Sequence, residues 1–160
     1  MMTHEDMKTI MYEEGRRQAL ALQERSVDMT GTELNAEDNH IPSFIEAVKV
    51  KNMLEREAGD TTGFVCKSSA GRVVRLLQKY NSDNYKHEDG TPWEPEDLPA
   101  QWRFVWSTDP KKALPFVKMA TSPYGVGDCC TENGETFRSK IPANVYAPSE
   151  YSQGWEKVEL

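Results

Sequence analysis

The chain has 160 residues and a formal net charge of -7 at pH 7. This length allows one ordinary domain, or two very small ones behind a helical lead. Lysines and arginines form no block, so nucleic acid is not an expected partner, and the apolar runs are far shorter than the roughly 20 residues that cross a bilayer. The first ten residues are acidic and lack an apolar core, so no secretory signal is predicted. The protein is therefore expected to start in a cytoplasm and not to be exported by that route.

Residues 1–40 are predicted to form a helical lead and a linker. Thr3 is a possible N-cap, and the apolar residues up to Gln23 fall roughly on one helical face: Met7, Ile10, Met11, Ala19 and Leu22. This stripe is thin, so the helix needs a partner surface. That surface is either its own domain, or a homo-oligomer seam or an anchor to a larger assembly. The polar stretch Ser26–Asn39 reads as a linker.

Residues 41–108 are predicted to form a first, degraded β module. Ser43 and Glu46 suggest a capping box, but the following residues alternate like a strand, so residues 41–60 are assigned to neither type. Apolar runs on both sides of Gly71 predict a hairpin, and Gln101–Trp106 predicts a closing strand. The polar, proline-containing stretch between them predicts a surface loop.

Residues 109–160 are predicted to form a C-terminal β module. Asn133-Gly134 is a strong hairpin signal, because a type I′ turn needs positive φ at both central residues. It joins expected strands near Asp128–Glu132 and Glu135–Lys140, and a third strand carries Trp155 and Val158. The segment after Asp109 could hold one helical turn. The predicted fold class is therefore α+β, with an N-terminal helix and two small three-stranded antiparallel β modules.

The two modules are predicted to be copies of one another. Placing Gly71 on Gly134 brings further residues into correspondence: Cys66 with Cys130, Val74 with Phe137, Arg75 with Arg138, Tyr85 with Tyr146, and Trp102 with Trp155. The first copy then holds an insertion of about ten residues around Lys86–Pro95. The shared order of glycine, arginine, asparagine and closing tryptophan favours duplication.

Catalytic and metal chemistry find little support. Cys66, Cys129 and Cys130 form no CxxC pattern, and the three histidines are scattered. The cysteines are therefore expected to be buried, reduced thiols rather than zinc ligands. The motifs of serine hydrolases, zinc proteases and phosphate-binding loops do not occur. We expect a protein that is not an enzyme and that needs no metal or cofactor.

Ligand recognition is better supported than catalysis, because the chain has four tryptophans and six tyrosines but only a small core. Aromatic rings bind sugar rings well, because the sugar C–H groups pack on the π face while the hydroxyls remain hydrated. The strand contexts predict a structural core of Trp102, Trp155, Phe137 and Val74. The loop contexts predict a glycan-binding set of Tyr146, Tyr151, Asn144 and Tyr85.

The pattern Gly127-Asp128-x-Cys130-x-x-Asn133-Gly134-x-x-Phe137-x-Ser139, closed by Gly154-Trp155-x-x-Val158, resembles the small carbohydrate-binding modules of families five and twelve. Cys130 stands where valine is usual, and Phe137 where tyrosine is usual. The resemblance implies a core role for Trp155 and glycan recognition by the module. The adjacent exposed tryptophans with which chitin-binding members hold sugar are missing between Lys140 and Tyr146.

A second resemblance covers Phe137-Arg138-Ser139, Asn144 to Pro148, and Gly154-Trp155-Glu156, together with Thr30–Leu34 and Ile41-Pro42. These stretches are similar to small bacteriophage and prophage proteins of this module class. The resemblance implies a virion accessory protein (a fibre, head decoration or tail-tip part) that assembles in the host cytoplasm with other virion proteins and faces host cell-surface glycan. Two alternatives are a purely structural capsid or tail cementing protein, and a detached binding module of a cell-wall hydrolase.

Overall fold

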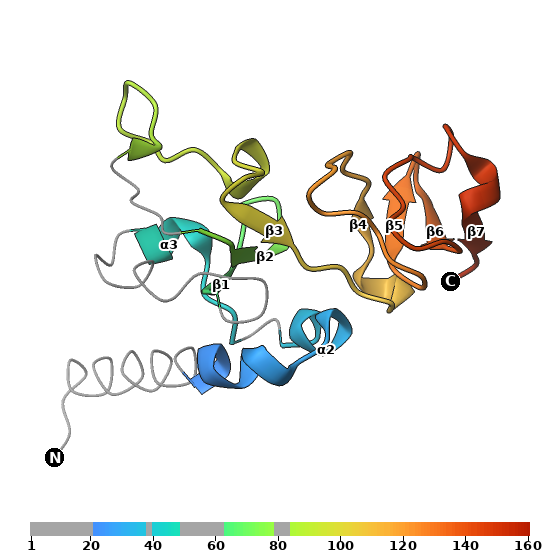
Figure 1. Cartoon of the computed structure of the whole chain (residues 1–160), viewed down its shortest axis with the longest axis horizontal. Helices are drawn as coiled ribbons and strands as arrows, with labels where there is room; N and C mark the ends of the chain where they lie inside the picture. Colours follow the sequence, from blue (N-terminus) through green and yellow to red (C-terminus); the bar gives the residue numbers. More distant parts are fainter. Residues whose placement is uncertain (1–20, 38–39, 49–62, 79–83) are drawn as a thin grey trace, which may run out of the picture.

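The computed structural model describes residues 21–37, 40–48, 63–78 and 84–160. These residues form two small β-sheets, one between positions 65 and 104 and one between positions 114 and 158, which lie next to each other along the molecule (Figure 1). Short helices accompany the first sheet. The predicted α+β class, with a helical N-terminal region and two β units, is confirmed.

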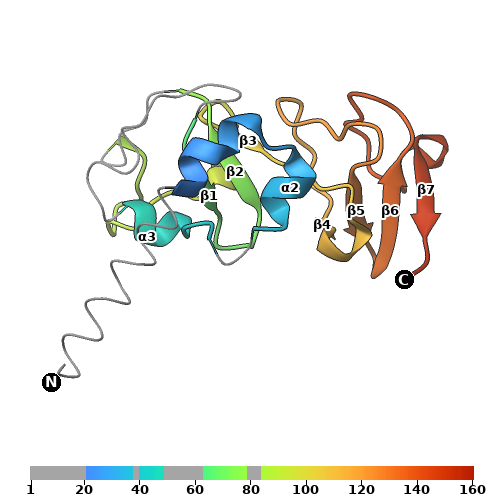
Figure 2. The ribbon, with the colours of Figure 1, turned by 90° about the horizontal axis from the view of Figure 1, so that it is seen from below.

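The segment expected to be a linker is helical over its described part. A helical stretch over residues 21–25 runs into a 3-10 helix, Ser26–Asp28, and then into α2, Gly31–Asn35. Thr30 starts α2 with a capping box: its hydroxyl accepts from the Glu33 amide, and the Glu33 carboxylate accepts from the Thr30 amide. Leu34 is then buried, which holds this segment on the first sheet (Figure 2). Residues 1–20, which carry most of the predicted N-terminal helix, lie outside the described residues.

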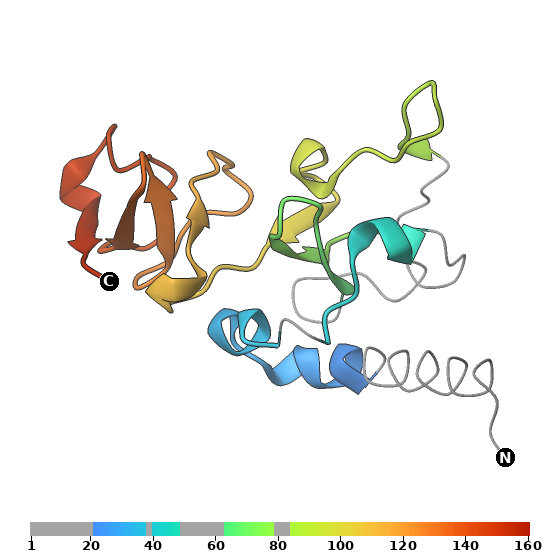
Figure 3. The ribbon, with the colours of Figure 1, turned by 180° about the vertical axis from the view of Figure 1, so that it is seen from behind.

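The ambiguous segment after Ile41 is helical where it is described. Helix α3 spans Phe44–Val48, and the Ser43 hydroxyl accepts from the Glu46 amide at 3.1 Å, which is one half of the suggested capping box. Phe44 and Ala47 are buried on the face that meets the first sheet (Figure 3). The strand-like pattern that follows falls on residues 49–62, outside the described residues.

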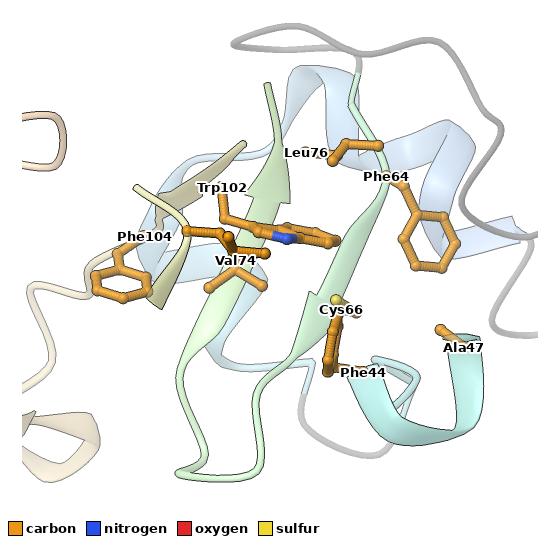
Figure 4. Packing of buried hydrophobic residues seen from close by; sticks show 9 residues of the cluster. Phe44, Ala47, Phe64, Cys66, Val74, Leu76, Trp102 and Phe104 are labelled. Carbon is orange, nitrogen blue, oxygen red and sulfur yellow. The ribbon is translucent and has the colours of Figure 1, made fainter. Parts of the chain in front are cut away.

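The first sheet has the order β1-β2-β3 and is antiparallel, with β1 at Val65–Lys67, β2 at Val73–Leu76 and β3 at Trp102–Phe104. Every residue of β2 is buried, because the sheet is covered on both faces. One face packs on α3 with the fully buried Trp102 at the centre of the cluster (Figure 4). The other face packs on the helical segment through a second cluster of Leu22, Leu34, Ile41, Val65 and Val73. The 3-10 helix Pro95–Asp97 precedes β3.

The second sheet has the order β4-β5-β6-β7, with β4 at Leu114–Pro115, β5 at Cys129–Glu132, β6 at Glu135–Ser139 and β7 at Trp155–Val158. The predicted turn is present, with positive φ at Asn133 (54°) and Gly134 (80°). The expected helical turn after Asp109 is the 3-10 helix Pro110–Lys112, and another, Ser152–Gly154, precedes β7. The sheet has four strands and not the three predicted, because the short β4 pairs in parallel with β5.

The two sheets share one register, as the predicted duplication requires. In each unit the buried cysteine of one strand faces the residue three positions after the turn glycine, and the closing tryptophan faces the residue two positions beyond it. These Cα partners are Cys66↔Val74 with Leu76↔Trp102, and Cys130↔Phe137 with Ser139↔Trp155. The backbone bonds that lead into the closing strands also correspond, from Leu77 to Gln101 at 2.7 Å and from Lys140 to Gly154 at 2.8 Å.

The correspondence extends to a parallel partner that the sequence comparison did not include. Ser43 forms a parallel bridge with Lys67, and Pro115 pairs in parallel with Thr131 one residue after the matching cysteine. Phe44 follows Ser43, and Phe116 follows Pro115. Each phenylalanine ring packs edge-on against the closing tryptophan of its own unit. The Phe44–Trp102 centroids are 5.7 Å apart at 87°, and the Phe116–Trp155 centroids are 6.2 Å apart at 86°. The described parts of the two units therefore share one strand register, a parallel partner and a Phe–Trp contact, which is the arrangement that the predicted duplication requires.

We expect no disulfide to contribute to stability. All three cysteines are free and buried, and burial raises the pKa of the Cys66 thiol and raises that of Cys130 to about 12. Adding a reductant should leave the melting temperature of the folded protein unchanged, and thiol reagents should react only after unfolding. A melting temperature that falls by many degrees on reduction would contradict this.

Candidate functional site

Two exposed tyrosines lie side by side in the loop that connects β6 to β7. Tyr146 is 49% exposed and Tyr151 is 39% exposed, and their ring centroids are 6.0 Å apart with the planes at 75°. Most large aromatic side chains of this unit are turned inward, so an exposed pair is a distinct feature of its surface. We refer to Tyr146 and Tyr151, with the neighbouring Lys118 and Glu150, as the tyrosine platform.

Two charged side chains border the rings. The Lys118 ammonium is 2.8 Å from the Glu150 carboxylate and 5.8 Å from the centroid of the Tyr146 ring, within the range of a cation–π contact. The Lys118 hydrogen bond, followed by that from the Ala147 amide, holds the pKa of Glu150 below its usual value. Neither residue was predicted as part of a site. Lys118 comes from the segment after β4, remote in sequence from the tyrosines, and Glu150 precedes Tyr151 in a polar loop.

The side chain of Asn144 stabilises the platform loop from the interior of the second unit. Its side chain is fully buried, and its amide nitrogen donates to the Ser139 hydroxyl and to the Gly154 carbonyl, both at 3.2 Å. Its side-chain oxygen accepts from the Tyr146 amide, also at 3.2 Å. The expectation that Asn144 contacts glycan is therefore wrong, because every one of these bonds is internal and the side chain is closed to solvent. Asn144 is a positioning residue.

Trp155 ties the same loop to the core of the second unit. Its indole is 5% exposed and packs edge-on against Tyr124 at 5.4 Å and 69°. Its indole N–H donates to the carbonyl of Tyr146 at 2.8 Å. Gly154 allows the Tyr151 ring to pack closely against the backbone, since a Cβ at position 154 would come within 3.0 Å of that ring. The platform thus rests on buried groups that fix both of its ends.

The fourth predicted glycan contact, Tyr85, lies in the first unit and not at the platform. It is half-buried against the core of that unit, and its hydroxyl accepts from the Gln101 side chain at 3.4 Å. The residue that corresponds to Tyr151 in the first unit is Leu98, which is buried. The described residues of the first unit therefore present no equivalent of the platform.

The residues predicted as structural core lie inside the two units. Trp102 and Val74 are fully buried, and Trp155 nearly so. Phe137 is half-buried and packs at the edge of the cluster that Trp155 forms with Tyr124 and Cys130.

One further exposed aromatic lies on the inserted hairpin of the first unit. Trp93 is 40% exposed and stacks on His87, with centroids 5.1 Å apart and planes at 12°. A bridge between Lys86 and Pro92 closes this hairpin. Its ring is thus already covered on one face by a side chain of the same hairpin, unlike the open pair at the platform.

The platform carries phenol hydroxyls, an ammonium and a carboxylate, which are hydrogen-bonding groups and not a nucleophile with its base. Within the described parts of the chain, no group of three side chains is arranged to ligate a metal ion. In the same ranges no helix has the length and apolar character needed to cross a membrane. Comparisons of the chain with protein families, with curated proteins and with solved structures find no match.

Proposed function

We propose that the protein is not an enzyme and that its C-terminal unit recognises a host-surface glycan through the tyrosine platform. The observation that carries this proposal is the exposed Tyr146–Tyr151 pair, held open by buried groups beneath it. A sugar ring packs its C–H face on such rings, and two rings at an angle present two surfaces to neighbouring sugars of a chain. The resemblance of the unit to small carbohydrate-binding modules supports the same proposal.

The charged rim supports recognition of hydroxyl groups. Lys118 donates and Glu150 accepts, so the pair offers both partners that a sugar hydroxyl can use. The platform is a surface feature and not a deep pocket, which predicts modest affinity for a single site. Such sites gain from repetition, because linked sites bind a repetitive polymer far more tightly than one site alone. A homo-oligomer or an array on a larger particle would provide that repetition.

The setting that we propose is a bacteriophage virion, where the chain serves as a fibre, head decoration or tail-tip accessory. Its partners there are other virion proteins, and its assembly takes place in the host cytoplasm. The resemblance around Asn144–Pro148 to phage and prophage proteins supports this setting. The rival roles remain a cementing protein that binds no sugar and a binding module that serves a cell-wall hydrolase.

Two measurements test these proposals separately. The purified full-length protein is applied to an array of bacterial cell-surface polysaccharides, where we expect specific binding that free oligosaccharide competes away. Absence of any bound glycan would remove the recognition role and favour the cementing role. Mass spectrometry of purified particles, made by the phage or prophage that encodes the chain, should detect the protein in the virion. Its absence from particles would favour the hydrolase module.

Tyr146→Ala and Tyr151→Ala should weaken glycan binding without unfolding the protein. Surface positions change the free energy of unfolding by less than about 1 kcal/mol. Loss of one stacking face should raise the Kd for the array glycan by roughly tenfold, which corresponds to about 1.4 kcal/mol. Calorimetric titration and thermal unfolding measure the two effects. Trp93→Ala is the matched control, since it removes an equally exposed aromatic away from the platform and should leave the Kd unchanged.

A further inference from the structure

The ammonium group of Lys118 occupies the space beside the Tyr146 ring and the Glu150 carboxylate. Its nitrogen is 2.8 Å from a Glu150 oxygen and 5.8 Å from the centroid of the Tyr146 ring. The Tyr151 ring stands next to that of Tyr146, with the two planes at 75°. A π face and a carboxylate both attract a cation. The platform thus already binds an ammonium group, and its own chain supplies that group.

The acceptor side of this contact is fixed by the backbone of the loop. The Ala147 amide donates to the Glu150 carboxylate at 3.2 Å, and the Tyr151 amide donates to the Ala147 carbonyl at 3.0 Å. The Ser149 amide donates to the Glu132 carboxylate at 2.9 Å, which places a second negative charge against the same loop. Glu150 and Tyr151 are therefore in position before a ligand arrives, which lowers the entropic cost of binding.

Lys118 is the partner that can leave this contact. Its side chain is 60% exposed, and that of Glu150 is 43% exposed. An ion pair at this exposure contributes little to stability, because water screens it and the long lysine side chain loses conformational freedom when one geometry holds it. A ligand ammonium that brings further contacts with the rings can therefore replace Lys118 at small cost.

We propose that the glycan bound at the tyrosine platform carries a primary ammonium group, as an amino sugar without an acetyl group does. The inference rests on the proposed glycan recognition and names the class of sugar. The ligand ammonium takes the place of Lys118 between Glu150 and the Tyr146 ring, while the C–H face of the sugar packs on Tyr151. A quaternary ammonium has no N–H to donate to Glu150, so the carboxylate favours a primary amine. The released Lys118 can donate to a neighbouring sugar hydroxyl.

Three oligosaccharides of equal length and linkage test the inference by calorimetry on the full chain, at constant ionic strength and at a pH where the amine is protonated. At one ring position a cello-oligosaccharide carries a hydroxyl, a chitin oligosaccharide an acetamide and a chitosan oligosaccharide an ammonium. We expect the chitosan oligosaccharide to bind at least roughly tenfold more tightly than the other two. Equal affinities would overturn the ammonium preference and leave glycan recognition standing. Absence of binding by the chitosan oligosaccharide would also overturn the inference, whereas glycan recognition itself fails only if the polysaccharide array yields no ligand.

Lys118→Ala distinguishes displacement of the lysine from a simple contact with it. Without its own cation the site is empty, so the chitosan oligosaccharide should bind at least about threefold more tightly. Lys157→Ala is the matched control, because Lys157 forms a half-exposed ion pair with Glu135 at 3.0 Å between β6 and β7, outside the platform loop. It changes the net charge equally and should bind like the parent. Weaker binding by folded Lys118→Ala, or an equal gain in Lys157→Ala, would contradict displacement.

Glu150→Gln removes the carboxylate charge and keeps an oxygen that can accept from the Ala147 amide. Its affinity for the chitosan oligosaccharide should fall at least roughly tenfold, while that for the cello-oligosaccharide changes little. Glu135→Gln removes an equal charge outside the platform and should leave both affinities unchanged. Thermal unfolding shows that both variants are folded. If the two variants weaken chitosan binding equally, the attraction is general to this acidic chain and the platform does not select the ammonium group.

Discussion

Trp155→Ala is expected to unfold the second unit. The indole is almost fully buried, it packs edge-on against both Tyr124 and Phe116, and its N–H is bonded to the carbonyl of Tyr146. Removing a buried tryptophan costs about 3–5 kcal/mol. A unit of this size has no more than a few kcal/mol to lose, because a small core buries little apolar surface. The free energy of unfolding of this part should therefore fall to near zero.

Amide NMR spectra of the variant measure this loss, because they report on the two units separately. Signals from residues 127–160 should collapse to random-coil positions while those of the first sheet persist. Trp93→Ala is the control, since its indole lies on an exposed hairpin and its loss should change stability by less than about 1 kcal/mol. A Trp155→Ala protein that keeps its second-unit spectrum and melts like the parent would refute the core role of this residue.

Asn144→Ala is expected to give the second largest effect, on stability and on glycan binding together. The change removes two donated bonds, to Ser139 and Gly154, and one accepted bond, from the Tyr146 amide. Each buried polar group that loses its partner costs about 1–3 kcal/mol, so we expect a total loss of about 2–4 kcal/mol. The Tyr146 backbone then keeps its bond from the Trp155 indole but loses the one to Asn144, so binding should weaken even where the protein remains folded.

Chemical denaturation and glycan titration at low temperature check both parts of that expectation. Asn133→Gly is a suitable comparison, because it alters an exposed asparagine whose backbone φ is already positive and glycine adopts that conformation readily. It should stay within about 0.5 kcal/mol of the parent. If Asn144→Ala is as stable as Asn133→Gly and binds glycan normally, Asn144 does not position the platform.

The elements encoded by local sequence were the ones that could be predicted. The turn at Asn133-Gly134 sets its own backbone conformation, and Trp102 and Trp155 stand in strand patterns that bury them. The alignment of the two copies followed from the spacing of such residues. The parallel strand β4 could not be predicted, because it is very short, contains Pro115, and exists only through its pairing with β5.

The candidate site was predictable only in part, for a related reason. Tyr146 and Tyr151 stand out as aromatic residues in a polar loop, and the structure brings them together. Asn144 has the same local context, yet its side chain turns inward, because the loop needs a buried partner for its own backbone groups. Lys118 reaches the platform only through the tertiary fold, so no local pattern marks it.

Comparison of the two units adds information that neither unit carries alone. Arg75 and Arg138 align in sequence, but their cross-strand partners, Arg103 and Glu156, are identified only by the register of the closing strands. The residue of the first unit that aligns with the exposed Tyr151 is Leu98, which is buried. The two units thus share one strand register while their surfaces differ.

NMR mapping of the full chain tests whether the tyrosine platform contacts glycan. The oligosaccharide selected on the array is titrated into isotope-labelled protein. We expect the largest amide shifts at Lys118 and from Tyr146 to Tyr151, with saturation transfer from the two tyrosine rings to the sugar. Shifts centred on the Trp93 hairpin, or transfer that survives in Tyr146→Ala and Tyr151→Ala, would show that glycan does not bind at the platform.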